Sequence, residues 1–312
     1  NMQTLSIIVP VWNEQETVPV FLETMNKVHT ESLADYAFEY WFIDDGSKDD
    51  TLKVLREEQA KNPAEVHYLS FSRNFGKEAG LYAGLEQATG EYVVVMDVDL
   101  QDPPELLPEM LAGVASGEWD AVGTRRVTRA GEPPIRTFFS ELFYKLVNRI
   151  SDTQIVEGAR DYRVMSRQMV DSLLSMTEYN RFSKGMFSWI GFKQKYLEFE
   201  NRDRVAGQTS WSFWSLFKYS IEGIVAFSQV PLAFVSFFGV LSFVTAIIGA
   251  LVIVIRALLV ANSSVAGWPS LVIIILFMGG IQLLSLGIVG RYISSIYLEV
   301  KNRPIYIARE KK

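Results

Sequence analysis

Two long stretches without any charged residue constrain this chain more than any other feature. They occupy residues 231–255 and 268–289, and each exceeds the roughly 20 residues that a helix needs to cross about 30 Å of hydrocarbon. Two helices buried in a soluble core are the alternative, but adjacent core helices rarely both lose every charge. The sequence therefore predicts two transmembrane helices.

The charges beside these stretches predict their orientation. The connection at 256–267 contains a single basic residue, whereas six basic residues follow the second stretch and three precede the first within 201–230. Basic residues favour the cytoplasmic side of a membrane. We therefore expect a multi-pass protein of the cell membrane, with both flanks and the preceding domain in the cytoplasm.

The part before the spans alternates between strand and helix patterns, which is typical of an α/β fold with a parallel sheet. Short runs rich in Val, Ile and aromatic residues predict strands, and apolar spacings of three and four predict helices. The predicted strands are 5–11, 39–44, 66–71 and 92–97, and the predicted helices are 17–28, 49–61 and 76–88. The net charge of −6 and the lack of a basic stripe argue against nucleic acid as a partner.

Two later segments have an amphipathic pattern. Residues 135–150 place apolar side chains on one helical face beside basic residues, and residues 211–225 do the same directly before the first span. Basic helices with aromatic residues tend to lie along the headgroup layer of a membrane. We expect interfacial helices here, with ordinary core packing as the alternative.

A pair of carboxylates follows the last of these predicted strands. Asp97 and Asp99 come directly after the apolar run 92–96, and Gln101 and two prolines follow. Magnesium and manganese take oxygen ligands, commonly one or two carboxylates together with substrate phosphates. Asp-x-Asp alone is weak evidence, but the strand end and the prolines that open a helix favour a metal site that neutralises a leaving diphosphate.

Charged residues at three other places are candidates for binding or catalysis. Asp44 ends a strand and suits hydrogen bonds to a base or ribose, although a turn with a helix cap would also use it. Arg73 and Lys77 lie at a helix N-terminus, which favours anions; a solvated basic turn is the alternative. Asp161 is flanked by two arginines and would be a base or a member of a salt bridge.

The motifs together resemble one family. In chain order they read Pro-x-x-Asn-Glu, Asp-Asp-Gly-Ser, Arg-Asn-Phe-Gly-Lys, Asp-x-Asp-Leu-Gln-Asp-Pro-Pro-Glu, Gly-x-x-Asp-Tyr-Arg and Arg-x-x-Gly, followed by the two spans. This series resembles the polyprenyl-phosphate glycosyltransferases of family 2 over essentially the whole chain. It is most similar to the bacterial enzymes that load glucose or N-acetylglucosamine onto undecaprenyl phosphate, relatives of dolichol-phosphate mannose synthase.

The resemblance implies a GT-A type α/β fold, a UDP-sugar donor, undecaprenyl phosphate as acceptor within the membrane lipid, inversion at the anomeric carbon, and Mg²⁺ or Mn²⁺ as cofactor. Enzymes of the family often form oligomers, so a homo-oligomer is an expected partner state. By position, the nucleoside site would be lined by Pro10, Asn13, Glu14 and Asp44, with Arg73 and Lys77 near it. The metal and diphosphate would be held by Asp97, Asp99 and Gln101, the phosphates would meet Arg125, Arg136 and Arg204, and the catalytic residues would be Asp99 and, beside the acceptor, Asp161.

Motifs and spans divide the chain into four expected parts. These are a nucleotide-sugar-binding domain at 1–130, an acceptor-side and membrane-interface region at 131–230, a transmembrane hairpin at 231–290 and a cytoplasmic tail at 291–312. The expected product is a polyprenyl-phosphate-sugar for modification of cell-envelope glycans.

One position departs from the family pattern, and two other functions remain open. Many relatives read Arg-x-x-Gly-x-Ser-Lys, whereas this chain has Ser210 in the lysine position. A processive polysaccharide synthase would need a longer channel than two spans and usually carries Gln-x-x-Arg-Trp, while 179–182 here reads Tyr-Asn-Arg-Phe. A non-catalytic membrane adaptor would bind nucleotide-sugars without turning them over.

Overall fold

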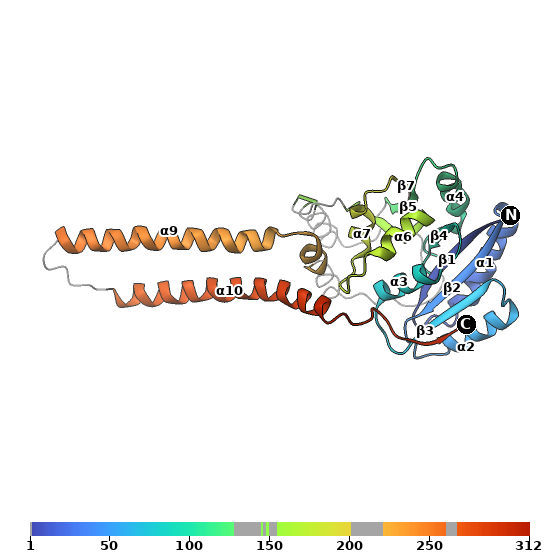
Figure 1. Ribbon diagram of the computed structural model, residues 1–312, viewed down its shortest axis with the longest axis horizontal. Coiled ribbons are helices and arrows are strands. Elements are labelled where there is room, and N and C mark those ends of the chain that lie inside the picture. Colours follow the sequence, from blue (N-terminus) through green and yellow to red (C-terminus); the bar gives the residue numbers. More distant parts are fainter. Residues whose placement is uncertain (1, 128–144, 146–147, 150–154, 201–220, 260–266) are drawn as a thin grey trace.

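The computed structural model describes residues 2–127, 145, 148–149, 155–200, 221–259 and 267–312. In these parts an α/β domain is joined to a long helical hairpin that extends away from it (Figure 1). The elements of the first half are β1 (Gln3–Val11), α1 (Thr17–Ser32), β2 (Tyr36–Asp44), α2 (Thr51–Lys61), β3 (Val66–Phe71), α3 (Lys77–Gln87), β4 (Tyr92–Val95), the short 3₁₀ helix η1 (Pro104–Leu106) and α4 (Leu107–Ala115). They are followed by β5 (Ala121–Arg126), β6 (Ala159–Ser166), α6 (Arg167–Ser175), α7 (Ser183–Trp189), β7 (Gln194–Phe199), α9 (Val230–Leu259), α10 (Trp268–Val300) and β8 (Ala308–Lys311).

The described strands form one mixed sheet in the order β7-β5-β6-β4-β1-β2-β3-β8. The four strands predicted from the sequence form its parallel centre, β4-β1-β2-β3. β6 joins β4 in antiparallel fashion, and β8 does the same beside β3. The predicted α/β fold with a parallel sheet core is confirmed.

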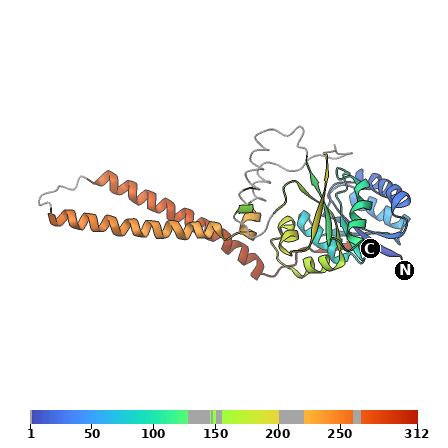
Figure 2. The same cartoon turned by 90° about the horizontal axis from the view of Figure 1, so that it is seen from above.

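Two hydrophobic cores lie on opposite faces of this sheet because successive strand residues point to opposite sides. In β1, Leu5, Ile7 and Val9 belong to the core that contains side chains of α1, α2 and α4, whereas Ile8 belongs to the other core. That second core contains side chains of α3, α6 and α7. Figure 2 shows helices on both sides of the sheet. Burial on both faces explains why the central strands read as continuous apolar runs.

The parallel strands end at a common edge of the sheet. β1 ends at Val11, its neighbour β2 ends at Asp44, and β4 on the other side of β1 ends at Val95. The motifs around Asn13, Asp44 and Asp97 therefore meet at one place, as carboxyl ends of parallel strands do in open α/β sheets.

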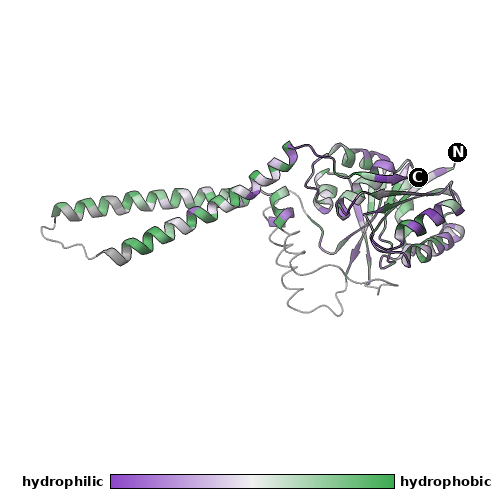
Figure 3. Ribbon diagram, turned by 90° about the horizontal axis from the view of Figure 1, so that it is seen from below, coloured by the Kyte–Doolittle hydropathy of each residue, from purple (hydrophilic) through white to green (hydrophobic). Residues whose placement is uncertain are grey.

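The hairpin of α9 and α10 has the length and composition of a membrane-spanning unit. Candidate spans are Val230–Gly249 and Leu271–Val300, with mean hydropathies of 2.3 and 2.5, and no part of either is buried inside the structure. Many large apolar residues of both helices are exposed, and the ribbon of both helices is coloured largely as hydrophobic in Figure 3. Because a soluble core helix would be mostly buried, these helices suit a lipid environment.

Residues 291–312, expected as a tail, continue α10 as far as Val300 and then return to the α/β domain. There β8 adds the last strand beside β3. Arg56 of α2 forms an ion pair with Glu310, and the Tyr306 ring stacks on Phe71 at 4.9 Å between ring centroids. The sheet edge at β3 is therefore covered by the segment that follows the hairpin.

The expected interfacial helices fall largely outside the described residues. This applies to nearly all of 135–150 and to 211–220, while residues 221–227 are helical and lead into α9. Whether the two segments lie at a membrane surface stays a prediction.

Candidate active site

A lysine joins two carboxylates at the common strand edge. Lys77 Nζ lies 2.8 Å from Asp97 Oδ1 and 2.7 Å from Asp161 Oδ2. Asp97 follows β4, Asp161 lies in β6, and Lys77 is the first residue of α3. Three elements that are distant in sequence thus bring one cation and two anions into direct contact, and the side chains retain 18–36% exposure.

The turn before α3 places Lys77 at this point. Asp45, directly after β2, accepts hydrogen bonds from the backbone N–H groups of Phe75 at 2.6 Å and Gly76 at 3.0 Å. Gly76 has φ +97°, a conformation that glycine adopts without strain. At Gly46 (φ +66°) an added Cβ would lie 2.5 Å from the backbone carbon of Arg73, so the two turns approach closely. The sequence between β2 and α3 therefore fixes where the helix begins.

Arg160 links Asp97 to a second carboxylate, that of Asp102, which is more deeply buried. Arg160 Nε donates to Asp102 Oδ1 at 2.9 Å, and its NH2 group lies 3.6 Å from Asp97 Oδ2. The side chain of Asp102 is 1% exposed, and its other oxygen has no hydrogen-bond partner among the described residues. Because a buried charge requires compensation, Arg160 stabilises Asp102 and orients the loop that follows Asp97.

Burial and neighbouring charges shift the pKa values of Asp161, Lys77 and Asp102. Burial alone would raise the pKa of Asp161, but the ammonium groups of Lys77 and then Lys184 outweigh burial and hold that pKa well below its usual range. Burial would likewise lower the pKa of Lys77, and the Asp161 and Asp97 carboxylates raise it instead. For Asp102, burial prevails over Arg160 and raises the pKa to about 6. Asp161 is therefore an anion with little tendency to accept a proton.

Of the predicted metal ligands, Asp97 belongs to this cluster, and Asp99 and Gln101 follow it closely in the chain. Asp99 is 4% exposed, and its Oδ1 accepts a hydrogen bond from the Gln101 backbone N–H at 3.2 Å. Leu100 between them has φ +56°. Among the described residues, no three His, Cys, Asp or Glu side chains are grouped to hold a metal ion by themselves. Mg²⁺ or Mn²⁺ would fit two carboxylate ligands, because phosphate and water can fill the other coordination positions of the ion.

The predicted nucleoside residues tie the ends of β1 and β2 together. Asn13 Oδ1 accepts from the Lys48 N–H at 2.8 Å, and the Glu14 N–H donates to the Thr51 hydroxyl oxygen at 2.9 Å. Asp44 is 1% exposed and accepts from the Ser47 N–H at 3.0 Å and the Ser70 hydroxyl at 2.7 Å. The turn that the sequence allowed for Asp44 is thus present, and a nucleoside contact by these residues stays a prediction.

The remaining predicted residues are not joined to the Lys77 cluster by any described contact. Pro10 faces α3, Arg73 lies over the Phe75 ring at 3.9 Å, and Arg125 pairs with Glu198. Arg136, Arg204 and Ser210 lie outside the described residues. Lys77 contacts the carboxylates at the strand edge, and its expected place near the nucleoside stays a prediction.

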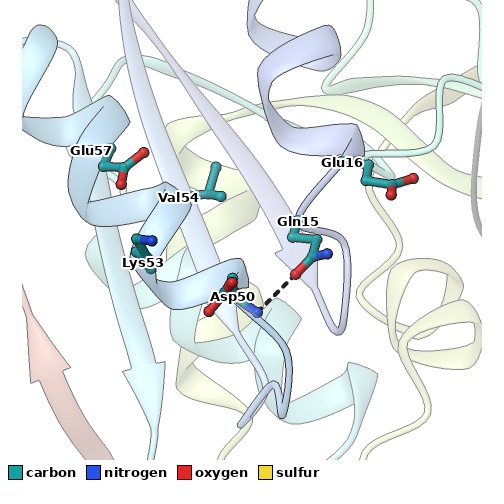
Figure 4. A pocket seen from close by; sticks show the side chains of 6 residues that line it. All are labelled: Gln15, Glu16, Asp50, Lys53, Val54 and Glu57. Carbon is teal, nitrogen blue, oxygen red and sulfur yellow. Dashed lines mark hydrogen bonds between the residues drawn. The ribbon is translucent and has the colours of Figure 1, made fainter.

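A shallow hollow lies next to the strand ends, but its lining differs from the predicted site. Figure 4 shows it between the start of α1 and the start of α2, with Asp50 N–H donating to Gln15 Oε1 at 2.9 Å. The lining residues are Gln15, Glu16, Asp50, Lys53, Val54 and Glu57. Three carboxylates against one lysine would repel a diphosphate, so we place the active site at the Lys77 cluster.

Sequence reasoning did not single out four residues in or beside this site. Asp45 lies in a turn, and Glu78 follows Lys77 in the first turn of α3 and accepts the Ser183 N–H. Asp102 lies beyond the predicted metal ligands, and Lys184 belongs to no motif. The sequence signal that could have indicated three of them is their position in the chain: Asp45, Glu78 and Asp102 each directly follow a predicted site residue.

Comparisons with known proteins show the family to which the chain belongs. The model for glycosyl transferase family 2 matches residues 6–174 of the 312. CsbB of Bacillus subtilis (strain 168) is 42% identical, over 98% of this chain and 91% of that protein. The bactoprenol glucosyl transferase of Shigella phage SfII is 40% identical, over 98% of this chain and 97% of that protein.

Among solved structures, glucosyl-3-phosphoglycerate synthase from Mycobacterium tuberculosis is 20% identical and covers 72% of this chain and 78% of that one, with a TM-score of 0.47. This likeness is distant, whereas the sequence relatives match almost from end to end. The family model spans the strand edge and the Lys77, Asp97 and Asp161 contacts. The chain therefore belongs to glycosyl transferase family 2, and it is a glycosyltransferase.

Proposed function

We propose that the enzyme transfers glucose or N-acetylglucosamine from a UDP-sugar to undecaprenyl phosphate, with inversion at the anomeric carbon. The observation that carries this proposal is the Lys77 cluster, which lies in the same chain as a hairpin long and apolar enough to cross a membrane. The relative from Shigella phage SfII is named for bactoprenol, a polyprenyl lipid, which supports a lipid acceptor.

The chemistry requires an attacking anion and stabilisation of a leaving one. A phosphate oxygen of the lipid forms the new bond to the anomeric carbon, while the bond between that carbon and the diphosphate breaks on the opposite face. A phosphate monoester already carries about −1.5 to −2 charges at pH 7. The reaction therefore needs no strong general base.

Asp161 suits an orienting role in this reaction. Its lowered pKa makes it a weak proton acceptor, and the Lys77 contact holds it in place. We propose that the charged carboxylate positions the sugar or the acceptor beside the anomeric carbon. Lys77 and Arg160 keep Asp97 and Asp102 compensated, so this part of the site stays ordered.

Asp97 and Asp99 would hold a divalent cation together with the donor, with Gln101 beside them. When bound, Mg²⁺ or Mn²⁺ supplies positive charge that stabilises the leaving diphosphate. This role follows from the two hard oxygen donors at the strand edge. The basic flanks of the hairpin favour a cytoplasmic active site, where a UDP-sugar would be available.

The purified full chain, incubated with undecaprenyl phosphate and a panel of labelled UDP-sugars, tests the proposal. We expect one UDP-hexose to yield a lipid-linked sugar whose anomeric configuration is opposite to that of the donor. Release of free sugar without a lipid product would contradict the assigned acceptor. Binding without turnover would favour the adaptor, and a growing polymer would favour the processive synthase.

A further inference from the structure

The segment before α7 connects the candidate active site to the candidate membrane helices. The backbone N–H groups of Tyr179 and Asn180 donate to the carboxylate of Glu299 at 2.9 Å and 3.1 Å, and Glu299 lies in the last turn of α10. Phe182 is buried and its ring lies 6.0 Å from that of Phe227, just before α9. The segment is thus held at the domain end of both helices of the hairpin.

The other end of this segment is fixed to the Lys77 cluster. Ser183, the first residue of α7, donates its backbone N–H to Glu78 Oε2 at 3.1 Å, and its hydroxyl bonds to the same oxygen. Glu78 directly follows Lys77 in the first turn of α3. The start of α7 is therefore anchored beside the lysine that contacts Asp97 and Asp161.

Lys184 directly follows Ser183 at the start of α7. Its side chain is half-buried, and it forms no ion pair or hydrogen bond with the residues that the structure describes. Its charge nevertheless acts on Asp161, where it is the second strongest cation after Lys77. Lys77 and Arg160 each contact two carboxylates already. Lys184 thus has positive charge available for an incoming anion.

We propose that Lys184 binds the phosphate of the lipid acceptor. Lys184 directly follows the segment that runs from the end of α10 to the start of α3. A phosphate at the headgroup level would enter from this hairpin side, whereas the donor residues are expected at the ends of β1 and β2. The inference rests on the proposed function for the identity of the acceptor. A half-buried ammonium without a carboxylate partner among the described residues gains a charge-assisted hydrogen bond when the phosphate arrives.

The test separates acceptor binding from donor binding. Lys184→Met and Lys184→Gln remove the charge, Lys184→Arg keeps it, and Lys195→Met removes an exposed lysine of β7 as the matched control. Initial rates with the active UDP-sugar are measured against undecaprenyl phosphate concentration, and UDP binding is measured by calorimetry. Direct binding of undecaprenyl phosphate and of uncharged undecaprenol is compared in nanodiscs, with thermal melting as the folding check.

We expect Lys184→Met and Lys184→Gln to raise the acceptor KM about tenfold to a hundredfold. UDP affinity should change less than about twofold, and Lys184→Arg should recover most of the acceptor affinity. In nanodiscs, both neutral variants should lose the preference for the phosphate over the alcohol. Lys195→Met should behave as the unmodified chain does.

An unchanged acceptor KM, or an equal loss of UDP affinity, would overturn the proposal; the second result would assign Lys184 to the donor diphosphate. Equal binding of the phosphate and the alcohol by the unmodified chain would also overturn it. If the unmodified chain prefers the phosphate but turns over no UDP-sugar, the proposed function fails while the nanodisc comparison still decides the role of Lys184.

Discussion

Lys77→Met should disturb the active site in a way that a simple loss of packing would not. The substitution keeps a long apolar stem but removes the ammonium that lies 2.8 Å from Asp97 and 2.7 Å from Asp161. Two carboxylates would then share one edge of the sheet with only Arg160 in described contact. Like charges at such a site oppose ionisation of one of them.

The free-energy cost of removing the Lys77 ammonium depends on how deeply the ion pairs are buried. Removal of one member of a fully buried ion pair costs about 3 to 5 kcal/mol. Because Lys77 is 36% exposed and its partners are 18–23% exposed, solvent screening reduces this to about 2 to 3 kcal/mol. If the loss falls on the transition state, the rate should drop about 30-fold to 150-fold.

The pH dependence gives the sharper readout. In the unmodified chain Lys77 holds the pKa of Asp161 well below its usual range, so the carboxylate stays charged across the working pH range. Without Lys77, burial raises this pKa, and the rate should fall as the pH decreases through the new value. Lys184 and Arg160 still oppose burial in the variant, so we expect the acid limb at a higher pH than in the unmodified chain.

Steady-state rates across the range from about pH 4.5 to about pH 8, measured with one UDP-sugar and undecaprenyl phosphate, check this expectation. Lys53→Met removes an exposed lysine of α2 and serves as the control. Superimposable pH profiles for the Lys77 variant and the unmodified chain would refute the assignment of Lys77 as the group that keeps Asp161 charged. Equal damage from both substitutions would refute it as well.

Three further predictions test the site and the topology. Asp99→Asn should abolish transfer while thermal melting stays unchanged, because an amide lacks the anionic oxygen that a hard cation prefers; near-normal turnover at saturating Mn²⁺ would contradict the metal assignment. Arg204→Ala should reduce the steady-state rate about tenfold to a hundredfold and Ser210→Ala far less, because a planar guanidinium holds phosphate oxygens in pairs; the reverse ranking would be incompatible with arginine-centred phosphate binding. Ser264→Cys should react with an impermeant thiol reagent outside intact cells and Lys311→Cys should not, and the opposite labelling pattern would place the active site on the other side.

The four central strands and the hairpin could be predicted from local pattern. Apolar runs define the central strands, and the two uncharged stretches make up most of α9 and α10. Since parallel strands end at one edge, the motifs at their ends are expected to meet. These features depend on periodicity within a few residues, which a sequence displays directly.

The partner of Asp161 could not be predicted this way. The flanking arginines suggest a local salt bridge, but adjacent strand residues point to opposite faces, which sends Arg160 to Asp102. Arg163 is buried elsewhere and donates to Gln194 at 2.7 Å. The ion-pair partner of Asp161 is Lys77, which lies 84 positions earlier in the chain. The two residues meet because β6, which carries Asp161, lies beside β4 in the sheet.

β8 was not predicted either, because it also depends on contacts between residues that are distant in the sequence. Its four residues, Ala-Arg-Glu-Lys, have no apolar alternation, so the segment reads as a polar tail. Its stability comes from long-range contacts: the ladder to β3, the Arg56–Glu310 pair and the Lys312 N–H that donates to the Tyr68 carbonyl at 3.0 Å. Such contacts depend on the folded domain rather than on local sequence.

The return of the chain to β3 has a practical consequence for preparing a water-soluble form. Truncation before α9 would remove β8 together with the hairpin and leave β3 as a bare edge with unpaired backbone groups. Bare edges of this kind invite pairing between molecules and aggregation. Excision of α9 and most of α10, with a short flexible connection from the end of the 221–227 helix to the residues before β8, would keep the sheet covered on that side. The soluble enzyme is thus to be obtained by an internal deletion and not by truncation.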